Sequence, residues 1–443
     1  MRIVLISAYE LGRQPFGIAS PAAWLRADGH EVVPVDLSIE TLPPGPIREA
    51  DLVALYLPMH TATRLAIPAI ARIRVLNPQA HLCCYGLYAP LNEEHLRALG
   101  VSTILGGEFE AGLLSLTRRP LALSQREPLI SLERLRFVPP DRSGLPALAR
   151  YAGIQFDGIV RRAGYTESSR GCKHLCRHCP VVPVYNGVFR VVQQDVVLED
   201  IRRQVRAGAQ HITFGDPDFW NGPSHARRIL EAMHQEHPGV SYDVTIKIEH
   251  LLANRAMLPL LKKTGCLFVT SAAESIDDEV LAKLDKGHTR ADFIEVVHLF
   301  KEMGLTLAPT FIPFTPWTTR ESYCELLRVL LDLDLVDSVS PVQLALRLLI
   351  TSGSRLLELD DIRRVTGPFD QTALVYRWEH ADSAVDHLAA GILRIANAAQ
   401  KTNQPRRETF REIWELAHEA PMYQDFGIMP RAAVPYLNEP WYC

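Results

Sequence analysis

Short apolar runs alternate with segments of helical length through most of this 443-residue chain. In the first 120 residues the apolar runs occupy positions 2–8, 31–36, 51–56, 81–85 and 102–105. Segments whose spacing and polarity suit helices lie between them, at 17–28, 61–76 and 93–99. Strands that are joined through helices form parallel sheets with both faces covered. The pattern therefore predicts an α/β fold with a Rossmann-like parallel sheet over residues 1–120.

The same alternation returns between residues 161 and 360, at intervals of roughly 30 residues that are typical of βαβ units. Strands are expected at 164–169, 211–215, 243–248, 267–272, 306–312 and 342–348. Helices are expected at 194–207, 224–237, 250–264, 277–284, 291–303 and 320–333. Six such units joined by right-handed crossovers make a partial (β/α)6 barrel of the TIM type. Active residues of such barrels collect where the strands end.

Two further regions complete the predicted organisation. Residues 121–160 hold Pro139, Pro140 and Pro146 and indicate a linker. Residues 361–443 are expected to form two helices, at 383–400 and 407–418, followed by a tail. The tail is rich in proline and aromatic residues, and disordered tails are usually poor in aromatics. We therefore expect it to pack across the mouth of the barrel.

Composition excludes several classes of protein. Hydrophobic residues make up 47% and charged residues 22%, as in ordinary globular proteins. The formal net charge of −4 gives no bulk electrostatic argument for a nucleic-acid partner. No apolar run reaches the roughly 18 residues that a membrane helix needs, and the opening residues indicate a strand rather than a signal peptide. Eight cysteines in so long a chain are not a disulfide framework, so a reducing cytoplasm is the expected location.

Three cysteines, Cys172, Cys176 and Cys179, lie in a loop that follows the predicted strand at 164–169. Three thiolates from one loop can hold three corners of an iron–sulfur cube, whereas ordinary [4Fe–4S] sites use four cysteines. No fourth cysteine lies nearby, so one iron would be open. A zinc site that adds His174 or His178 is the alternative, although structural zinc sites usually draw on two separated pairs. A disulfide would leave one cysteine unpaired.

This Cys-x3-Cys-x2-Cys loop after a first strand resembles the signature of the radical SAM enzymes. The resemblance implies a [4Fe–4S] cluster held by Cys172, Cys176 and Cys179, whose open iron binds S-adenosylmethionine (SAM). It also implies reductive cleavage of SAM with an electron from an external donor of the flavodoxin or ferredoxin type. One departure is His178, which stands where the family usually has Tyr, Phe or Trp.

Five further residues are candidates for binding SAM, because they stand near predicted strand ends. Gly215 permits close approach of its backbone to a ligand, and Asp216 can accept hydrogen bonds from an ammonium group. Lys247 can contact a carboxylate, and Glu274 lies in a turn that resembles the family's Gly-x-Glu-Ser. Arg347 can bind the SAM carboxylate through two hydrogen bonds.

Each of these candidates has a simpler alternative. Gly215 and Asp216 also suit an ordinary turn, and Lys247 can point to solvent. Glu274 also suits the start of a helix. Arg347 also suits a structural ion pair.

The N-terminal region resembles, in order and pattern, the cobalamin-binding domain that precedes many radical SAM domains. The Asp-x-His-x-x-Gly run that supplies an axial His elsewhere is absent, and Tyr9, Glu10, Leu11 and Gly12 follow the first strand instead. Some radical SAM relatives bind cobalamin without that His, so cobalamin remains a candidate cofactor. A sheet that binds nothing and shapes the substrate channel is the alternative. Gly106 and Gly107, before the next helix, form a turn that can cradle an anion.

The ending Glu439-Pro440-Trp441-Tyr442-Cys443 resembles the tail of the CUAEP/CCAEP-tail radical SAM proteins. A related group includes the radical SAM enzyme of arsinothricin synthesis, which moves a 3-amino-3-carboxypropyl group from SAM to arsenic. The resemblance implies a catalytic Cys443 that binds a soft acceptor. We hypothesise that the reading frame ends at a UGA codon for selenocysteine. A genuine C-terminus with an ordinary cysteine is the alternative.

The sequence therefore predicts a radical SAM enzyme of the transferase class that acts on a small-molecule substrate, with no membrane or nucleic-acid partner. The first hypothesis is transfer of a group, for example 3-amino-3-carboxypropyl. The second is cobalamin-dependent methylation. The third is a non-catalytic iron–sulfur or zinc-binding module.

Overall fold

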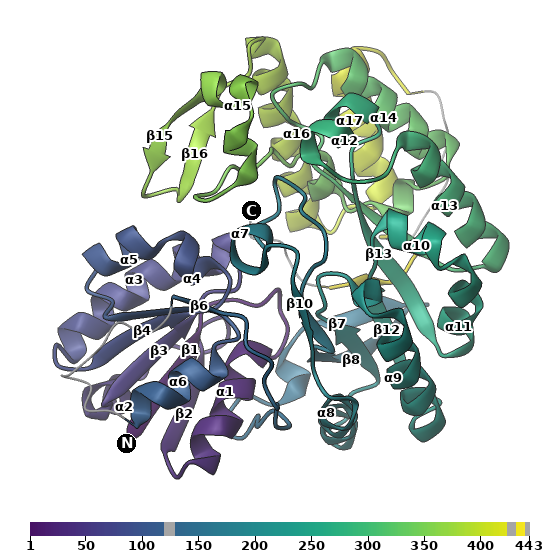
Figure 1. Ribbon diagram of the computed structural model, residues 1–443. Helices are drawn as coiled ribbons and strands as arrows, with labels where there is room; N and C mark the ends of the chain where they lie inside the picture. The colour runs from purple at the N-terminus through teal and green to yellow at the C-terminus, as the bar shows by residue number, and fades with distance from the viewer. Residues whose placement is uncertain (119–128, 423–430, 439–443) are drawn as a thin grey trace.

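The computed structural model describes residues 1–118, 129–422 and 431–438, and contains two large sheets that lie side by side (Figure 1). The first sheet has the order β2-β1-β3-β4-β5-β6, and its strands are parallel. These strands are β1 Arg2–Ser7, β2 Glu31–Asp36, β3 Leu52–Tyr56, β4 His81–Tyr85, β5 Thr103–Gly107 and β6 Ile130–Ser131. Its helices are α1 Phe16–Ala27, α2 Pro44–Glu49, α3 His60–Leu76, α4 Tyr88–Leu91, α5 Glu93–Ala98 and α6 Glu110–Thr117.

Both faces of the first sheet are packed. Along β1, Ile3 and Leu5 join one apolar cluster, while Val4 and Ile6 join another on the opposite face. Successive side chains of a strand point to opposite faces, so a run that is apolar at every position must be covered on both sides. The predicted parallel sheet with both faces covered is confirmed.

The second sheet curls into a half-barrel of order β14-β13-β12-β11-β8-β7-β17. Its parallel strands are β8 Ile159–Thr166, β11 His211–Phe214, β12 Ser241–Thr245, β13 Cys266–Glu274 and β14 Leu307–Phe311. The helices that follow are α8 Gln194–Arg206, α9 Pro223–Glu236, α10 Ile248–Ala253, α11 Leu258–Lys263, α12 Asp278–Leu284, α13 Arg290–Met303 and α14 Arg320–Asp332. The predicted α/β class with a partial TIM-type barrel is confirmed.

The prediction of a sixth barrel strand at 342–348 is wrong. A short 3-10 helix, Pro341–Leu344, occupies its first half, and the rest makes one isolated bridge between Phe314 and Arg347. Proline has no N–H to give to a ladder and suits the first turn of a helix. The apolar residues of this run are buried, but as a loop against the barrel rather than as a strand.

The predicted linker ends in a hairpin that sequence inspection missed. Strand β7, Gly153–Phe156, pairs antiparallel with the start of β8 and extends the second sheet. The connecting residues Asp157 and Gly158 have φ values of 49° and 73°. Positive φ at both central residues is the mark of a type I′ hairpin, for which Asp-Gly is a preferred pair.

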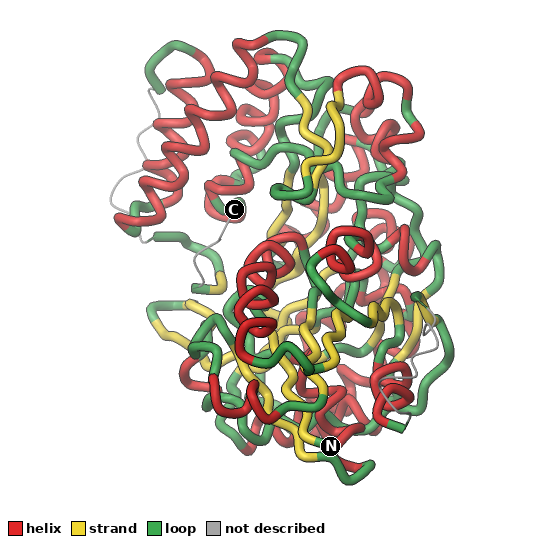
Figure 2. Tube along the Cα trace, turned by 90° about the vertical axis from the view of Figure 1, so that its left-hand side faces the viewer, coloured by secondary structure: helices red, strands yellow, loops and turns green. Residues whose placement is uncertain are grey.

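The C-terminal region adds helices and a second missed hairpin. The expected helices are α16 Ser383–Thr402 and α17 Arg406–His418, which pack against each other. Before them come α15 Asp360–Val365 and the hairpin β15 Thr366–Asp370 with β16 Val375–Trp378. The helices lie at the end of the molecule farthest from the N-terminus (Figure 2).

The described part of the tail, residues 431–438, contributes β17, Tyr436–Leu437, which pairs antiparallel with β7. The tail thus adds an edge strand to the half-barrel, while residues 423–430 and 439–443, with Cys443, lie outside the described residues. None of the described helices combines the length and apolar character that a bilayer span requires.

Candidate active site

The cysteine loop leaves a short strand, β9 Ser169–Gly171, and enters a helical turn, α7 Val182–Tyr185. Strand β9 pairs with β10, Phe189–Val191. Gly171 has a φ of 74°, and a Cβ there would overlap the Tyr185 ring and the Val188 carbonyl oxygen. The chain can turn into the loop at this position only because the residue is glycine.

The three predicted ligand cysteines form no disulfide and lie in partly apolar surroundings. Cys176 is 7% exposed, and Cys172 and Cys179 pack against the apolar cluster on one face of the first sheet. Burial raises the pKa of the Cys179 thiol to about 12, and the neighbouring Cys176 and Cys172 act in the same direction. Such thiols become thiolate ligands when a cation compensates their charge. Three soft donors on one loop, one buried and two half-buried, therefore fit an iron–sulfur cluster.

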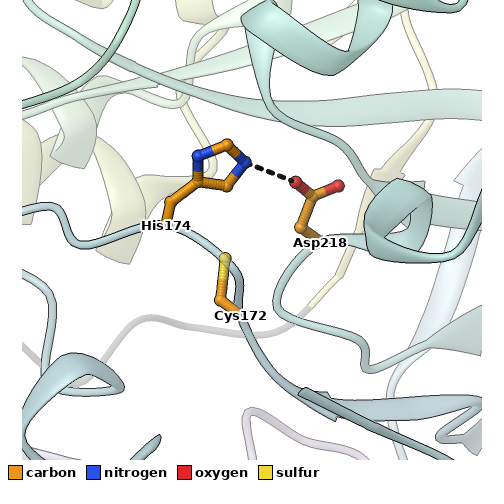
Figure 3. Close-up of side chains that lie close together, drawn as sticks. All are labelled: Cys172, His174 and Asp218. Carbon is orange, nitrogen blue, oxygen red and sulfur yellow. Dashed lines mark ion pairs between the residues drawn. The ribbon is translucent and has the colours of Figure 1, made fainter. Parts of the chain in front are cut away.

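His174 belongs to a second group of polar side chains beside the loop (Figure 3). A ligand atom from each of Cys172, His174 and Asp218 lies within 4.8 Å of the other two. His174 Nε2 is 3.9 Å from the Asp218 carboxylate and 3.2 Å from His250 Nε2, and His250 Nδ1 is 2.6 Å from the same carboxylate. Of the ligands that a zinc site would use, this group contains Cys172 and His174 but neither Cys176 nor Cys179.

Glu274, at the end of β13, contacts His178 of the cysteine loop. His178 Nε2 is 3.1 Å from Glu274 Oε1, and Lys286 Nζ donates to the same oxygen at 3.4 Å. Burial alone would raise the pKa of Glu274, but Lys286 and His178 outweigh it and hold the pKa at about 2. Glu274 has a φ of 64° at the end of β13, so its carboxylate is presented by a strained backbone. The residue that departs from the family pattern, His178, thus orients an ionised carboxylate beside the cysteines.

Asp216 is buried, but chain donors already use its carboxylate. It accepts hydrogen bonds from the Ser168 N–H at 3.0 Å and from the Ser168 and Ser169 hydroxyls at 2.7 and 2.6 Å. Burial raises its pKa to about 6 despite these bonds. A Cβ at the preceding Gly215 would overlap the Tyr165 hydroxyl. The pair therefore joins the end of β11 to the segment that leads into the cysteine loop.

Lys247 is buried and contacts a carboxylate, but from the start of a helix rather than from a strand, whereas Arg347 lies elsewhere. Strand β12 ends at Thr245, and Lys247 caps the next helix with its Nζ 3.3 Å from Glu249. Arg347 forms an ion pair with Asp386 and lies 4.1 Å over the Trp378 ring. The structure thus gives Arg347 the structural ion pair that was its alternative, and does not bring it to the cysteine loop.

A buried ion cluster missed by sequence inspection joins the two sheets. Arg170, two residues before Cys172, donates to Glu110 at 2.7 and 2.9 Å and to Glu167 at 2.8 Å, with Glu108 at 3.5 Å. Glu108 and Glu110 follow β5 of the first sheet. The Gly106-Gly107 turn therefore does not cradle an anion, since it presents carboxylates to Arg170 and the Glu108 N–H donates to Ser131.

A cavity of about 450 Å³ lies between the two sheets. The first sheet contributes the loops after β1 and β3, with Tyr9, Glu10, Leu11, Arg13, Pro58 and Met59. The half-barrel contributes polar side chains and the end of β11, with Thr213, Gly215, Asp216, Asp243, Thr245, Thr270 and Thr310. The C-terminal region closes it with Arg406, Pro435, Tyr436 and Leu437.

Residues 166–330, which include the cysteine loop and the parallel strands from β11 to β14, match the model of the Radical SAM superfamily. This stretch is a radical SAM domain. A radical SAM domain uses a [4Fe–4S] cluster and SAM, so the two cofactors that the resemblance to this family implies are confirmed. The relatives below agree with the radical SAM resemblance and do not bear on the resemblance of the tail.

Among curated proteins, the chain is similar to the hopanoid C-3 methylase of Methylococcus capsulatus, with 26% identity over 324 residues. This match covers 69% of the chain and 62% of the relative. The bacteriochlorophyllide d C-12(1)-methyltransferase of Chlorobaculum tepidum is 27% identical over 133 residues, covering 29% of the chain and 28% of the relative. The chain thus spans less than two thirds of either relative.

Two solved structures share the fold. The cobalamin-dependent SAM radical enzyme OxsB with aqua-cobalamin and SAM bound has a TM-score of 0.68 at 14% identity, covering 94% of this chain and 71% of that one. The radical SAM methyltransferase TsrM from Kitasatospora setae, with cobalamin and a [4Fe–4S] cluster bound, has a TM-score of 0.58 at 17% identity. That match covers 75% of this chain and 73% of TsrM. At these identities the likeness establishes the fold, an N-terminal parallel sheet followed by a half-barrel.

Proposed function

We propose that this protein is a cobalamin-dependent radical SAM methyltransferase that acts on a small molecule. The observation that carries the proposal is the cavity between the sheets. The radical SAM domain forms one wall, and the carboxyl edge of the first sheet forms the other. Ligands of parallel α/β sheets bind at that edge. A cofactor on the first sheet and SAM on the second would therefore face one shared space.

The cysteine loop would hold the cluster through Cys172, Cys176 and Cys179, and the cluster would supply the electron that cleaves SAM. Glu274 is ionised and adjoins the loop, so it would accept hydrogen bonds from the SAM ammonium group or ribose. Gly215 would let backbone approach the ligand, while Asp216 positions the strand connection before the loop. Lys247 would hold the carboxylate of Glu249 near His174, since Glu249 lies 3.5 Å from His174 Nδ1.

The residues at the edge of the first sheet fit a corrinoid bound without a nitrogen ligand from this edge. The loops after β1 and β3 present Tyr9, Glu10, Leu11, Pro58 and Met59 to the cavity, and no His or Cys. A corrinoid there would supply methyl-group transfer. The chain would position it and exclude water, as proteins do for cofactors that carry the chemistry.

The names of the relatives favour methylation over the transfer of a 3-amino-3-carboxypropyl group. Both curated relatives above are named as methyl-transferring proteins, and TsrM is named as a methyltransferase. The transfer hypothesis depended on Cys443, which lies outside the described residues. A flavodoxin- or ferredoxin-type protein remains the proposed electron donor.

The test is product analysis on the anaerobically reconstituted full chain, supplied with SAM, hydroxocobalamin and a flavodoxin reducing system. We expect S-adenosylhomocysteine to form only when cobalamin is present. Methylthioadenosine would instead indicate the aminocarboxypropyl route. An intact cluster with no SAM fragment would indicate the non-catalytic module. Cys176→Ala provides the background, since it removes one of the proposed cluster ligands.

A further inference from the structure

One end of the cavity is closed by the C-terminal region, through the start of α17 and the tail strand β17. Arg406, the first residue of α17, lines the cavity there together with Tyr436 and Leu437. Its backbone N–H donates to the Arg431 carbonyl at 2.9 Å. Its guanidinium donates to the backbone carbonyl of Asp337 and lies 5.2 Å over the Tyr436 ring. The side chain is therefore held in place at the cavity wall.

Arg406 has no carboxylate within ion-pair distance among residues 1–118, 129–422 and 431–438. Asp337 binds the adjacent Arg407 through Oδ2, which lies 2.7 Å from Arg407 Nε, while its Oδ1 has no hydrogen-bond partner among the described residues. A second guanidinium, that of Arg431, lies 5.5 Å from the Tyr436 ring and donates to the amide oxygen of Asn403. Burial and the nearby Arg431 lower the pKa of Arg406 to about 10, so it is still charged at neutral pH. Among the described residues, Arg406 therefore presents a cation at the cavity end without a direct ion pair, although the charge of Asp337 partly offsets it.

The acidic groups along the radical SAM wall have other partners and form no ion pair with Arg406 among the described residues. Asp216 accepts from Ser168 and Ser169, and Asp243 accepts from His211 at 2.8 Å and from Thr213 at 2.6 Å. A half-buried charge without a direct ion pair costs free energy, so a ligand that brings an anion to Arg406 gains affinity.

Apolar side chains line the cavity beside the polar ones of the half-barrel. They are Ile154, Phe268, Ala308, Pro309 and Leu437, of which all but Pro309 belong to one apolar cluster. Gly215 and Asp216 also line the cavity, and the Asp216 carboxylate holds the segment that enters the cysteine loop. A ligand in the cavity would thus find a cation, apolar surface and the proposed site of chemistry in one space.

We propose that the substrate is an amphipathic acid, whose carboxylate or phosphate binds Arg406 and whose apolar body lies against Phe268 and Leu437. The acidic end would face α17, and the carbon to be modified would face the end of β11. A guanidinium binds either anion through paired hydrogen bonds. This substrate class rests on the proposed function, since it takes the cavity to be the substrate site. SAM carries a carboxylate as well, so the test must separate the two sources of the anion.

The experiment compares acids with their neutral amides on the reconstituted full chain at saturating SAM. A panel of arylalkyl carboxylic acids, their primary amides and the matching alkyl phosphates is added, and the shift in melting temperature is followed by circular dichroism. We expect acids or phosphates to raise the melting temperature and the amides to leave it unchanged. In Arg406→Gln the preference for acids should disappear, and in Arg406→Lys it should return in part.

Arg202→Gln is the control. Arg202 forms an exposed pair with Glu236 and does not line the cavity, so this variant should keep the preference for acids. Equal shifts from acids and amides, no shift from any acid, or an acid preference that survives Arg406→Gln would overturn the proposal. If SAM alone produces the Arg406-dependent shift and acids add nothing, the arginine serves SAM and the proposal is wrong. None of these melting-temperature measurements requires cobalamin, so their outcome is independent of whether the methyltransferase proposal fails.

Discussion

The two sheets use the same parallel βα architecture but bury different side chains. Strands of the first sheet carry apolar residues on both faces, such as Ile3, Val4, Leu5 and Val53, and two apolar clusters cover them. Strands of the half-barrel turn Thr213, Asp243, Thr245, Thr270 and Thr310 toward the cavity. The first sheet can therefore offer a ligand only its edge, whereas the second offers a concave polar face.

The difference teaches how the two halves share one site. A sheet packed on both faces is rigid, and its edge residues Glu108 and Glu110 bind Arg170 just before the cysteine loop. The half-barrel supplies the loop and the lumen. We infer that the first sheet acts as a platform that sets the position of the loop against the barrel.

The largest expected effect is that of Cys176→Ala. If the loop cysteines hold the cluster, the reconstituted variant should lose most of its iron and its broad visible absorbance, and SAM cleavage should fall to background. The matched variant is Cys84→Ala, which changes a buried cysteine in β4 of the first sheet. That variant should keep its iron and lose about 1 kcal/mol of stability at most through a small cavity. Equal iron content in the two variants would contradict the conclusion that the cysteine loop, and not the first sheet, binds the iron.

The second prediction concerns the ion cluster between the sheets. Arg170→Met leaves Glu108, Glu110 and Glu167 buried without their cation, which typically costs about 3–5 kcal/mol. Urea unfolding should register this loss of free energy, together with slower formation of the cluster. The control is Arg202→Met, whose exposed pair with Glu236 at 2.6 Å is expected to contribute at most about 1 kcal/mol. Similar losses of unfolding free energy in the two variants would show that Arg170 does not join the two sheets.

The third prediction uses two glycines of the radical SAM domain. A Cβ at Gly215 would overlap the Tyr165 hydroxyl, whereas a Cβ at Gly239 meets nothing within 4 Å. Gly215→Ala should therefore lose about 1–3 kcal/mol through overpacking and bind SAM more weakly in equilibrium dialysis. Gly239→Ala should match the native chain in both measurements. Unchanged SAM binding in Gly215→Ala would exclude the close approach assigned to this backbone.

The smallest effect is expected at Glu10, at the edge of the first sheet, because water reaches the cavity. Burial and the charge of Asp36 raise the pKa of Glu10 to about 8. A carboxyl with a raised pKa in the folded state contributes stability that is complete below its unfolded pKa and is lost as pH rises toward 8. Glu10→Gln should therefore be more stable relative to the native chain at pH 8.5 than at pH 5, as measured by urea unfolding. An equal difference in free energy at both pH values would show that Glu10 ionises normally.

Local patterns predicted much of this molecule. Apolar runs between helical segments identified the strands of the first sheet, because a strand buried on both faces has few alternatives. The cysteine loop was equally local, since its three thiols are separated by three and two residues. The hairpin of β7 and β8 was missed although Asp157 and Gly158 signal it, because the surrounding prolines suggested a linker. The false strand at 342–348 came from reading apolar residues without weighing Pro341.

The contacts that define the site could not be predicted, because they join distant segments. His178 meets Glu274 across 96 positions, and Arg170 meets Glu110 across 60. Arg406 reaches the cavity from a helix that follows the barrel. No spacing rule links such residues. The sequence likewise could not show that Arg347 pairs with Asp386. SAM binding and a structural ion pair both require a guanidinium, so the residue type does not separate them.

The most direct test of the account is whether the chain retains cobalamin and the cluster together. The full chain is reconstituted anaerobically with iron, sulfide and hydroxocobalamin, passed through gel filtration, and measured for iron, sulfide and corrinoid absorbance. We predict about four irons and one corrinoid per chain, with the corrinoid retained in Cys176→Ala while the iron is lost. A chain that keeps its iron but elutes without corrinoid would contradict the proposal that the first sheet holds a cofactor.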